Sequence, residues 1–219
     1  QPVRLDTKGG EVTTTDPLRQ AVRTIAETAI ENEAYFCELD AAFGDGDFGY
    51  SLARGFEIVL EQWDALSANE SPAFLRGVAT TLMKRLGGTS GPIWGTAFLR
   101  AGGAITDGED IGITQVVGML DASIAGIQKR GGASVGDKTL LDALCPLRDE
   151  VAAWSTKEAT PGDVAHAAAK AARAGADHTT ELAASRGRAS YVGDRSIGAP
   201  DPGAVAIAVM SEKIAALWT

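Results

Sequence analysis

The stretch SPAFLRGVATTLMKRL, residues 71–86, carries the pattern that settles the fold class. It opens with a serine before a proline, and a capping side chain ahead of a proline at the first helical position is typical of a helix start. Its apolar residues recur at intervals of three and four, which places them on one face of an α-helix. These residues are Phe74, Leu75, Val78, Leu82, Met83 and Leu86. The stretch therefore predicts an amphipathic helix with one side in a core.

The same two signals recur along the rest of the chain. Asp16, Thr160 and Asp201 each precede a proline and predict three further helix starts. Because proline lacks an N–H group, Pro146 is expected to kink or interrupt the helix in which it lies. Apolar residues with helical spacing predict helices over residues 18–30, 52–63, 93–99, 116–127, 140–154, 164–182 and 207–217.

The sequence gives no sign of strands, because no segment alternates β-branched or aromatic residues with polar ones over a sustained run. The prediction is an all-α fold of roughly eight antiparallel amphipathic helices, in one up-and-down bundle or helical barrel. We expect one domain over residues 16–219, preceded by an arm or linker over residues 1–15. The polar, glycine-punctuated stretch 186–204 has no helical period and is expected to be a long functional loop.

Composition and charge narrow the range of partners. The 219 residues carry a net charge of −9, and 45% of them are hydrophobic. An acidic chain does not attract nucleic acid or anionic lipid at long range, so neither is expected as a partner, and an anionic ligand needs local cations or bound metal. No apolar run is long enough to cross a bilayer. Cys37 and Cys145 lie far apart and outside any CxxC pattern, so we expect reduced, structural thiols and a cytoplasmic protein.

The most specific motif is acidic, with Asp40, Asp45 and Asp47 interleaved with glycines over residues 40–49. Its GxGxxG spacing does not indicate a dinucleotide fingerprint, because no strand precedes it and its aspartates would repel a phosphate. The ligand spacing of a calcium-binding EF-hand is also absent. Carboxylates on a flexible turn suit one or two Mg²⁺ ions that bridge to phosphate oxygens. The alternative is that Asp40 and Asp45 cap helices while Asp47 is solvated.

Three other glycine-rich segments point to an anionic ligand. Residues 87–92, GGTSGP, lead into a predicted helix and fit either a phosphate cradle or an ordinary serine cap. Residues 131–139 resemble a Walker A loop, but an aspartate spoils the register and the segment follows a helix, which leaves Lys138 as a phosphate-binding or a structural cation. In the loop 186–204, Arg188 and Arg195 supply positive charge suited to phosphate.

Taken in order, the motifs GDGDFG, GGTSGP, GDKTLLDAL, GRASYVGDRSIG and DPGA resemble the L subunits, or nucleotide-binding domains, of dihydroxyacetone kinases. The resemblance implies a helical barrel with ADP or ATP and two Mg²⁺ ions at its open end. It implies that Asp40, Asp45 and Asp47 bind the metal and that Arg188 and Lys138 act in catalysis. The residues that fall where the family contacts nucleotide are Phe48, Gly49, Tyr50, Ser51, Thr89, Ser90, Gly131, Leu140, Arg188, Asp201, Pro202 and Gly203.

The resemblance also implies partners, because in this family the keto-sugar acceptor is held on a separate subunit or domain. Stand-alone L subunits keep ADP bound and are re-phosphorylated by a phosphotransferase-system phosphocarrier, whereas fused enzymes exchange ATP. The sequence is compatible with a stand-alone subunit, the C-terminal domain of a fused kinase, or a non-catalytic, nucleotide-loaded coregulator. Phe48 and Ser51 stand where the family usually has histidine and asparagine, so a polar contact to the nucleotide is lost or replaced by stacking.

Overall fold

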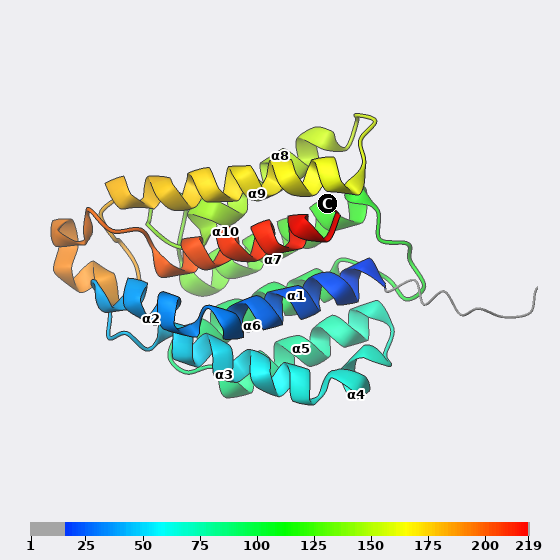
Figure 1. Cartoon of the computed structure of the whole chain (residues 1–219), viewed down its shortest axis with the longest axis horizontal. Coiled ribbons are helices and arrows are strands. Elements are labelled where there is room, and N and C mark those ends of the chain that lie inside the picture. Colours follow the sequence, from blue (N-terminus) through cyan, green and yellow to red (C-terminus); the bar gives the residue numbers. More distant parts are fainter. Residues whose placement is uncertain (1–15, 219) are drawn as a thin grey trace, which may run out of the picture.

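The computed structural model describes residues 16–218, and within this range it contains helices and loops but no strand (Figure 1). The predicted arm or linker over residues 1–15 lies outside the described residues. The α-helices are α1 (Pro17–Glu31), α2 (Glu33–Ala41), α3 (Phe48–Glu61), α4 (Trp63–Ser67), α5 (Ser71–Arg85), α6 (Ser90–Gly103), α7 (Ile113–Gly131), α8 (Leu141–Trp154), α9 (Pro161–His178) and α10 (Pro202–Ala215). Three 3₁₀ helices follow the later ones: η1 (Thr179–Glu181), η2 (Arg188–Ser196) and η3 (Ala216–Trp218).

Side-chain caps explain three of the four predicted helix starts. The Asp16 carboxylate accepts the N–H of Leu18 at 2.8 Å, and the Asp201 carboxylate accepts the N–H of Ala204 at 2.8 Å. Thr160 and Asp163 form a reciprocal capping box at the start of α9. The expectation for Ser71 is corrected in detail, because Ser71 is the first residue of α5, which Glu70 precedes without a side-chain cap bond.

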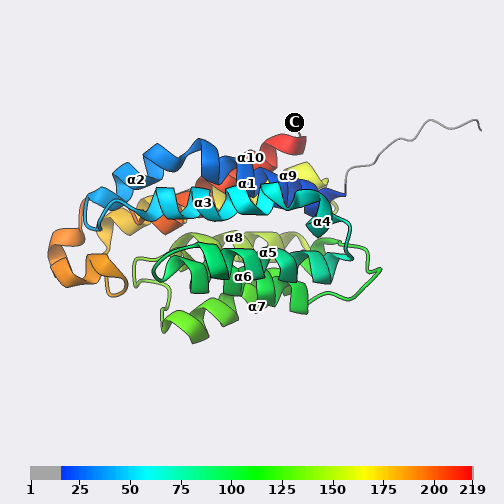
Figure 2. The ribbon, with the colours of Figure 1, turned by 90° about the horizontal axis from the view of Figure 1, so that it is seen from below.

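Eight helices form a closed ring. Each of α1, α3, α5, α6, α7, α8, α9 and α10 packs against the next, and α10 packs against α1. Figures 1 and 2 show that these helices lie roughly along one direction and that neighbours run in opposite senses. The predicted all-α, up-and-down helical barrel is therefore confirmed.

The interior of the ring is filled by large apolar side chains. Phe56 of α3 meets Trp94 and Phe98 of α6 edge-on, with ring centroids 6.4 Å and 6.2 Å apart. Fully buried side chains also come from α5, among them Phe74, Leu75, Val78 and Leu82. Burial of these side chains supplies the main driving force for closing the barrel. None of the helices over residues 16–218 combines the length and the apolar character that crossing a bilayer requires.

The structure adds two helices that the apolar pattern did not predict. Along α2 only Phe36 is fully buried, and α4 has no buried residue, so neither helix has an apolar stripe to detect. α2 continues beyond the barrel after a break at Asn32, whose side chain donates to the Thr28 carbonyl at 2.8 Å. This extension carries the loop between α2 and α3 to one end of the barrel, at the left of Figure 1.

Two other expectations are corrected in part. Pro146 lies inside α8 and does not interrupt it. The Asp142 carbonyl, which an N–H at position 146 would have bonded, faces Gly175 of α9. The stretch 186–204 is not wholly irregular, because residues 188–196 form η2, with a bend at Gly193, whose φ is 56°. Cys37 and Cys145 are half-buried free thiols.

Candidate functional site

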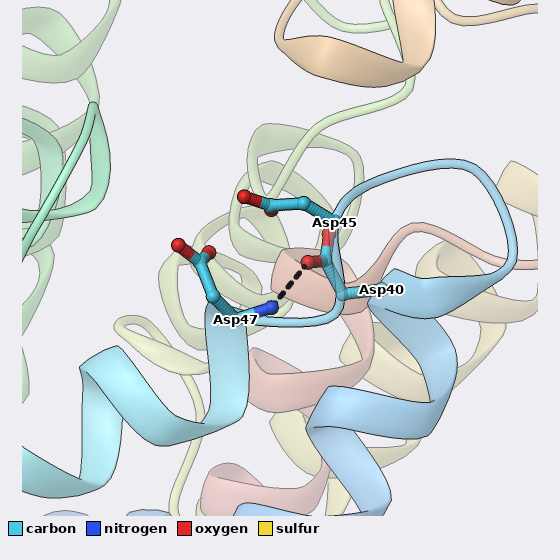
Figure 3. A group of neighbouring side chains, drawn as sticks. All are labelled: Asp40, Asp45 and Asp47. Carbon is cyan, nitrogen blue, oxygen red and sulfur yellow. Dashed lines mark hydrogen bonds between the residues drawn. The ribbon is translucent and has the colours of Figure 1, made fainter.

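The loop between α2 and α3 brings three carboxylates together at one end of the barrel. Asp40 lies in the last turn of α2, while Asp45 and Asp47 follow in the loop, and Figure 3 shows how close the three groups lie. The turn requires its glycines: a Cβ at Gly44 would lie 2.8 Å from the backbone carbonyl oxygen of Asp40, and Gly46 has a φ of 74°. The backbone therefore folds tightly around the first carboxylate and directs the other two toward it.

One oxygen from each of these carboxylates lies within 4.8 Å of the others. Asp40 Oδ2 also accepts the N–H groups of Asp47 at 3.1 Å and Phe48 at 3.4 Å, at the start of α3. Asp40 therefore caps the start of α3, as the alternative interpretation of the motif expected. Asp45 and Asp47 are exposed. Carboxylate oxygens gathered at this spacing are the donor set that a hard divalent cation prefers, so these residues fit Mg²⁺.

Arg188 of η2 approaches the same cluster. Its guanidinium forms an ion pair with Asp45 and lies 3.8 Å from Asp47 Oδ2. Three neighbouring carboxylates repel one another, so a cation among them lowers the electrostatic free energy of the site. Arg188 of η2 and the acidic loop between α2 and α3 are more than 140 residues apart in sequence, and they meet at this cluster.

A cavity of about 810 Å³ opens beside the acidic cluster. One wall is the turn at residues 87–90, where Gly88 has a φ of 58° and α6 begins at Ser90. Neither Thr89 nor Ser90 uses its hydroxyl in a hydrogen bond within the described part of the chain, and the N-terminus of α6 favours an anion. The segment 185–191, Leu140 and residues 201–203 also line the cavity.

Most of the predicted site residues line this one cavity. They are Asp40, Asp45, Asp47, Phe48, Thr89, Ser90, Gly131, Lys138, Leu140, Arg188, Asp201, Pro202 and Gly203. Gly49, Tyr50 and Ser51 do not, because only one side of α3 faces the cavity. Gly49 instead packs on α2, where a Cβ would lie 2.1 Å from the Glu33 carbonyl oxygen, and Tyr50 is 56% exposed. Ser51 lies next to Gly87, where a Cβ would be 3.6 Å from the Ser51 hydroxyl oxygen.

Lys138 contributes to the cavity wall but is held as a structural cation. Its Nζ donates to the carbonyl oxygens of Leu182 at 3.0 Å, Ser196 at 2.6 Å and Ala199 at 2.7 Å. An ammonium has three N–H donors, so all three are used and none remains for a phosphate. The predicted catalytic role of Lys138 is therefore not supported by this geometry.

Two arginines that the sequence argument did not single out line the same cavity. Arg130 lies in the last turn of α7, and Arg186 lies 3.6 Å from Asp137 Oδ2. A signal for Arg130 was present, since Lys129 and Arg130 directly precede the glycine pair at residues 131–132. Together with Arg188, these side chains give an otherwise acidic protein a local concentration of positive charge.

Asp201 is the most strongly perturbed acid of the cavity. Burial raises its pKa to about 7, although the N–H of Ala204 and the nearby Lys138 ammonium act in the opposite direction. The same carboxyl caps α10 at the point where residues 201–203 line the cavity. Its protonation therefore changes both the charge at the cavity wall and the cap of this helix. At neutral pH the group is divided between its two forms.

Comparisons with known proteins identify the family of the chain. Residues 42–216 match the family model described as the DAK2 domain. The chain is 34% identical over 181 residues to the ADP-binding subunit DhaL of the PEP-dependent dihydroxyacetone kinase of Escherichia coli, which covers 83% of this chain and 86% of that subunit. It is 35% identical over 201 residues to the L-erythrulose 1-kinase of Mycolicibacterium smegmatis, covering 88% of this chain and 34% of that enzyme.

Among solved structures, the chain is similar to the dihydroxyacetone kinase of C. freundii in complex with AMP-PNP and Mg²⁺. The TM-score is 0.74 at 24% identity, and the match covers 99% of this chain and 38% of that one. The chain thus spans about a third of the erythrulose kinase and of the C. freundii kinase but most of the E. coli subunit. The resemblance to kinase L subunits is confirmed, and the chain belongs to the DAK2 domain family.

Proposed function

We propose that this chain is the nucleotide-binding subunit or domain of a short keto-sugar kinase. It binds ADP or ATP together with two Mg²⁺ ions, and a phosphoryl group passes to dihydroxyacetone or a similar sugar held on a partner. The observation that carries the proposal is the cluster of three carboxylates, with oxygens within 4.8 Å, beside a cavity lined by arginines and by the turn at residues 87–90. The relatives that match over most of their length are named as ADP-binding subunits of such kinases.

The proposed roles follow from the position of each group. Asp40, Asp45 and Asp47 hold the metal, which when bound neutralises charge on the phosphate oxygens. The backbone N–H groups at the start of α6 and the hydroxyls of Thr89 and Ser90 receive phosphate oxygens. Arg188, released from Asp45, offers its guanidinium to the group in transfer. These residues bind and orient the phosphates, and the chemistry is mostly electrostatic.

The acceptor sugar and its partner belong to the same proposal. The cavity is open at the end of the barrel, where Tyr191, 88% exposed, stands at the rim. A sugar-binding subunit or domain covers this opening and supplies the general base. We place the reaction in the cytoplasm, where a phosphocarrier re-phosphorylates bound ADP or ATP exchanges with ADP.

A titration tests nucleotide binding directly. In isothermal titration calorimetry with Mg²⁺ present, we expect the full chain to bind ADP and the Asp47→Asn variant to bind it at least tenfold more weakly. Asp107→Asn, at an exposed loop aspartate that does not line the cavity, provides a matched charge-loss control that leaves the affinity unchanged. Equal affinity of the Asp47→Asn variant and the unchanged chain would remove the proposed metal site.

A second measurement separates the two ways of using nucleotide. A chain that works with a phosphocarrier retains ADP through gel filtration, whereas a domain of a fused kinase exchanges it within the separation. With the sugar-binding subunit of the same organism added, transfer to dihydroxyacetone is followed by the formation of its phosphate. No transfer from either donor, with ADP still bound, would favour the non-catalytic coregulator.

A further inference from the structure

The buried side chain of Lys138 contacts the segment that carries Arg188. The residue is 4% exposed, and its ammonium donates to three carbonyl oxygens, those of Leu182, Ser196 and Ala199. These acceptors come from the two ends of one segment, residues 182–199, which we term the arginine lobe. One cation therefore holds the beginning and the end of the lobe at the same point.

Hydrogen bonds within the lobe and to residue 180 just before it show that its ends meet. The Ser196 hydroxyl oxygen accepts the N–H of Ala184 at 2.8 Å, and the N–H of Gly198 donates to the Thr180 carbonyl oxygen at 2.9 Å. Arg188 lies away from this junction, in an exposed part of the lobe. The lobe is thus a closed loop whose two ends meet at residues 182–184 and 196–199, which we term its neck. The position of the lobe depends on the contacts there.

The backbone at Lys138 is arranged to aim the side chain at that neck. Lys138 has a φ of 60°, the one positive φ outside glycine over residues 16–218. The buried Asp142 carboxylate maintains the turn, accepting the N–H groups of Gly136 at 2.6 Å and Thr139 at 2.7 Å. A non-glycine residue keeps this unfavourable conformation only where surrounding contacts enforce it.

The same ammonium also reaches the acidic loop. Lys138 Nζ lies 6.0 Å from the centre of the Phe43 ring, and Phe43 is between Asp40 and Asp45 in sequence. A cation over an aromatic face is attracted by the ring. Lys138 therefore contacts both the segment that supplies the arginine and the loop that supplies the carboxylates.

We propose that Lys138 is a positioning residue that sets where Arg188 stands relative to Asp45 and Asp47. It acts through the neck of the arginine lobe and the Phe43 ring, without touching the phosphates, because its donors are already used. Neutralising it leaves three carbonyl oxygens without their donor, and the bond to Ser196 among them is buried. The ends of the lobe are therefore expected to separate more often than the barrel opens. The expected loss of nucleotide affinity rests on the proposed function. The expected loosening of the arginine lobe does not.

Limited proteolysis of the ligand-free full chain tests the tether itself. In the Lys138→Met variant we expect trypsin to cleave after Arg186, Arg188 and Arg195 at least tenfold faster, while cleavage after Arg76 and Lys84 in α5 keeps its rate. Lys170→Met, an exposed lysine of α9, is the matched control and behaves as the unchanged chain. If the methionine variant does not fold, Lys138→Gln, which keeps two N–H donors, takes its place. Its lobe is expected to be cleaved at a rate between those of the unchanged chain and a fully untethered lobe. Unchanged lobe cleavage, or equal acceleration in lobe and barrel, would overturn the proposal.

A double-variant cycle tests whether the effect passes through Arg188. Arg188→Ala is expected to weaken Mg–ADP binding about tenfold and Lys138→Gln severalfold, while the double variant stays within about twofold of Arg188→Ala alone. Effects that multiply would mean that Lys138 acts on nucleotide by another route, and would overturn the proposal. If the unchanged chain binds no ADP, the proposed function fails, and the proteolysis result still decides the role of Lys138.

Discussion

Asp40 and Asp47 belong to one carboxylate cluster but support it in different ways. Asp40 accepts two N–H groups at the start of α3, so it contributes to folding as well as to the metal site. Asp47 has no such bond among the described residues and is exposed. The two functions can therefore be separated by choosing the replacement.

We expect Asp40→Ala to lower the free energy of unfolding by about 1 kcal/mol, because the start of α3 loses its acceptor. For a chain of this size the melting temperature falls by about 2–4 °C. Asp40→Asn keeps an acceptor oxygen and the stability, yet both variants weaken Mg–ADP binding because the negative charge is lost. Thermal melting and calorimetry on the pair check this. Equal melting temperatures would show that Asp40 does not stabilise α3.

Phe48 both packs against the core and lines the cavity. Its ring lies 6.1 Å from that of Phe36, and it contacts the main apolar cluster. We expect Phe48→His to lower the free energy of unfolding by about 1 kcal/mol, since an aromatic contact and apolar burial are lost. Phe48→Tyr keeps the ring and the stability. Urea unfolding and ADP titration on both variants measure the two effects, and a histidine variant of unchanged stability with tighter ADP binding would contradict the packing role.

Glycines inside the helices decide how closely neighbouring helices approach. In α9, a Cβ at Gly175 would lie 2.1 Å from the Asp142 carbonyl oxygen of α8. In α7, a Cβ at Gly118 would meet no atom within 4 Å in the described structure. The first glycine is therefore required by packing, and the second is only a weak point in its helix.

Alanine at these two positions should have opposite effects. Gly175→Ala forces α8 and α9 apart and is expected to cost at least about 1–3 kcal/mol, the usual range for overpacking. Gly118→Ala stabilises the protein by about 0.5–1 kcal/mol, because alanine is the better helix former. Chemical unfolding monitored by circular dichroism measures both. Destabilisation by Gly118→Ala would mean that α7 has a neighbour that the barrel does not account for.

The stability of the whole barrel depends on pH partly through Asp201. Burial raises the pKa of this group to about 7 in the folded chain, above the value of about 3.9 of an unfolded aspartate. Between these values the folded state binds more protons than the unfolded state. The contribution of Asp201 to stability is therefore fully present below about pH 4, and it is lost as the pH rises to about 7.

Asp201→Asn should remove this dependence while still capping α10. We expect the difference in unfolding free energy between the variant and the unchanged chain to shift in favour of the variant as the pH rises from 4 to 8. Urea unfolding at four pH values measures it, and Asp107→Asn, an exposed loop aspartate, serves as the control. Parallel curves for Asp201→Asn and the unchanged chain would show that its pKa is not raised by folding.

Local signals along the chain were enough to predict the eight helices of the barrel. Apolar spacing depends only on residues within a few turns, and caps such as Asp16 and Asp201 act within three residues. The acidic loop and the turn at residues 87–92 were also recognisable, because their chemistry is concentrated in a few neighbouring residues. Their order along the chain matched the family without any three-dimensional information.

Contacts between distant segments settled the rest. Pro146 does not interrupt α8, Gly49 packs on α2, and Lys138 binds carbonyls 44–61 residues away. Each outcome depends on what lies opposite the residue, and that neighbour comes from another part of the chain. Periodicity and motifs thus identify the helices and the candidate ligand residues. Packing decides which of these side chains face the cavity and which face another helix, because burial and hydrogen bonding are satisfied across the barrel rather than along the chain.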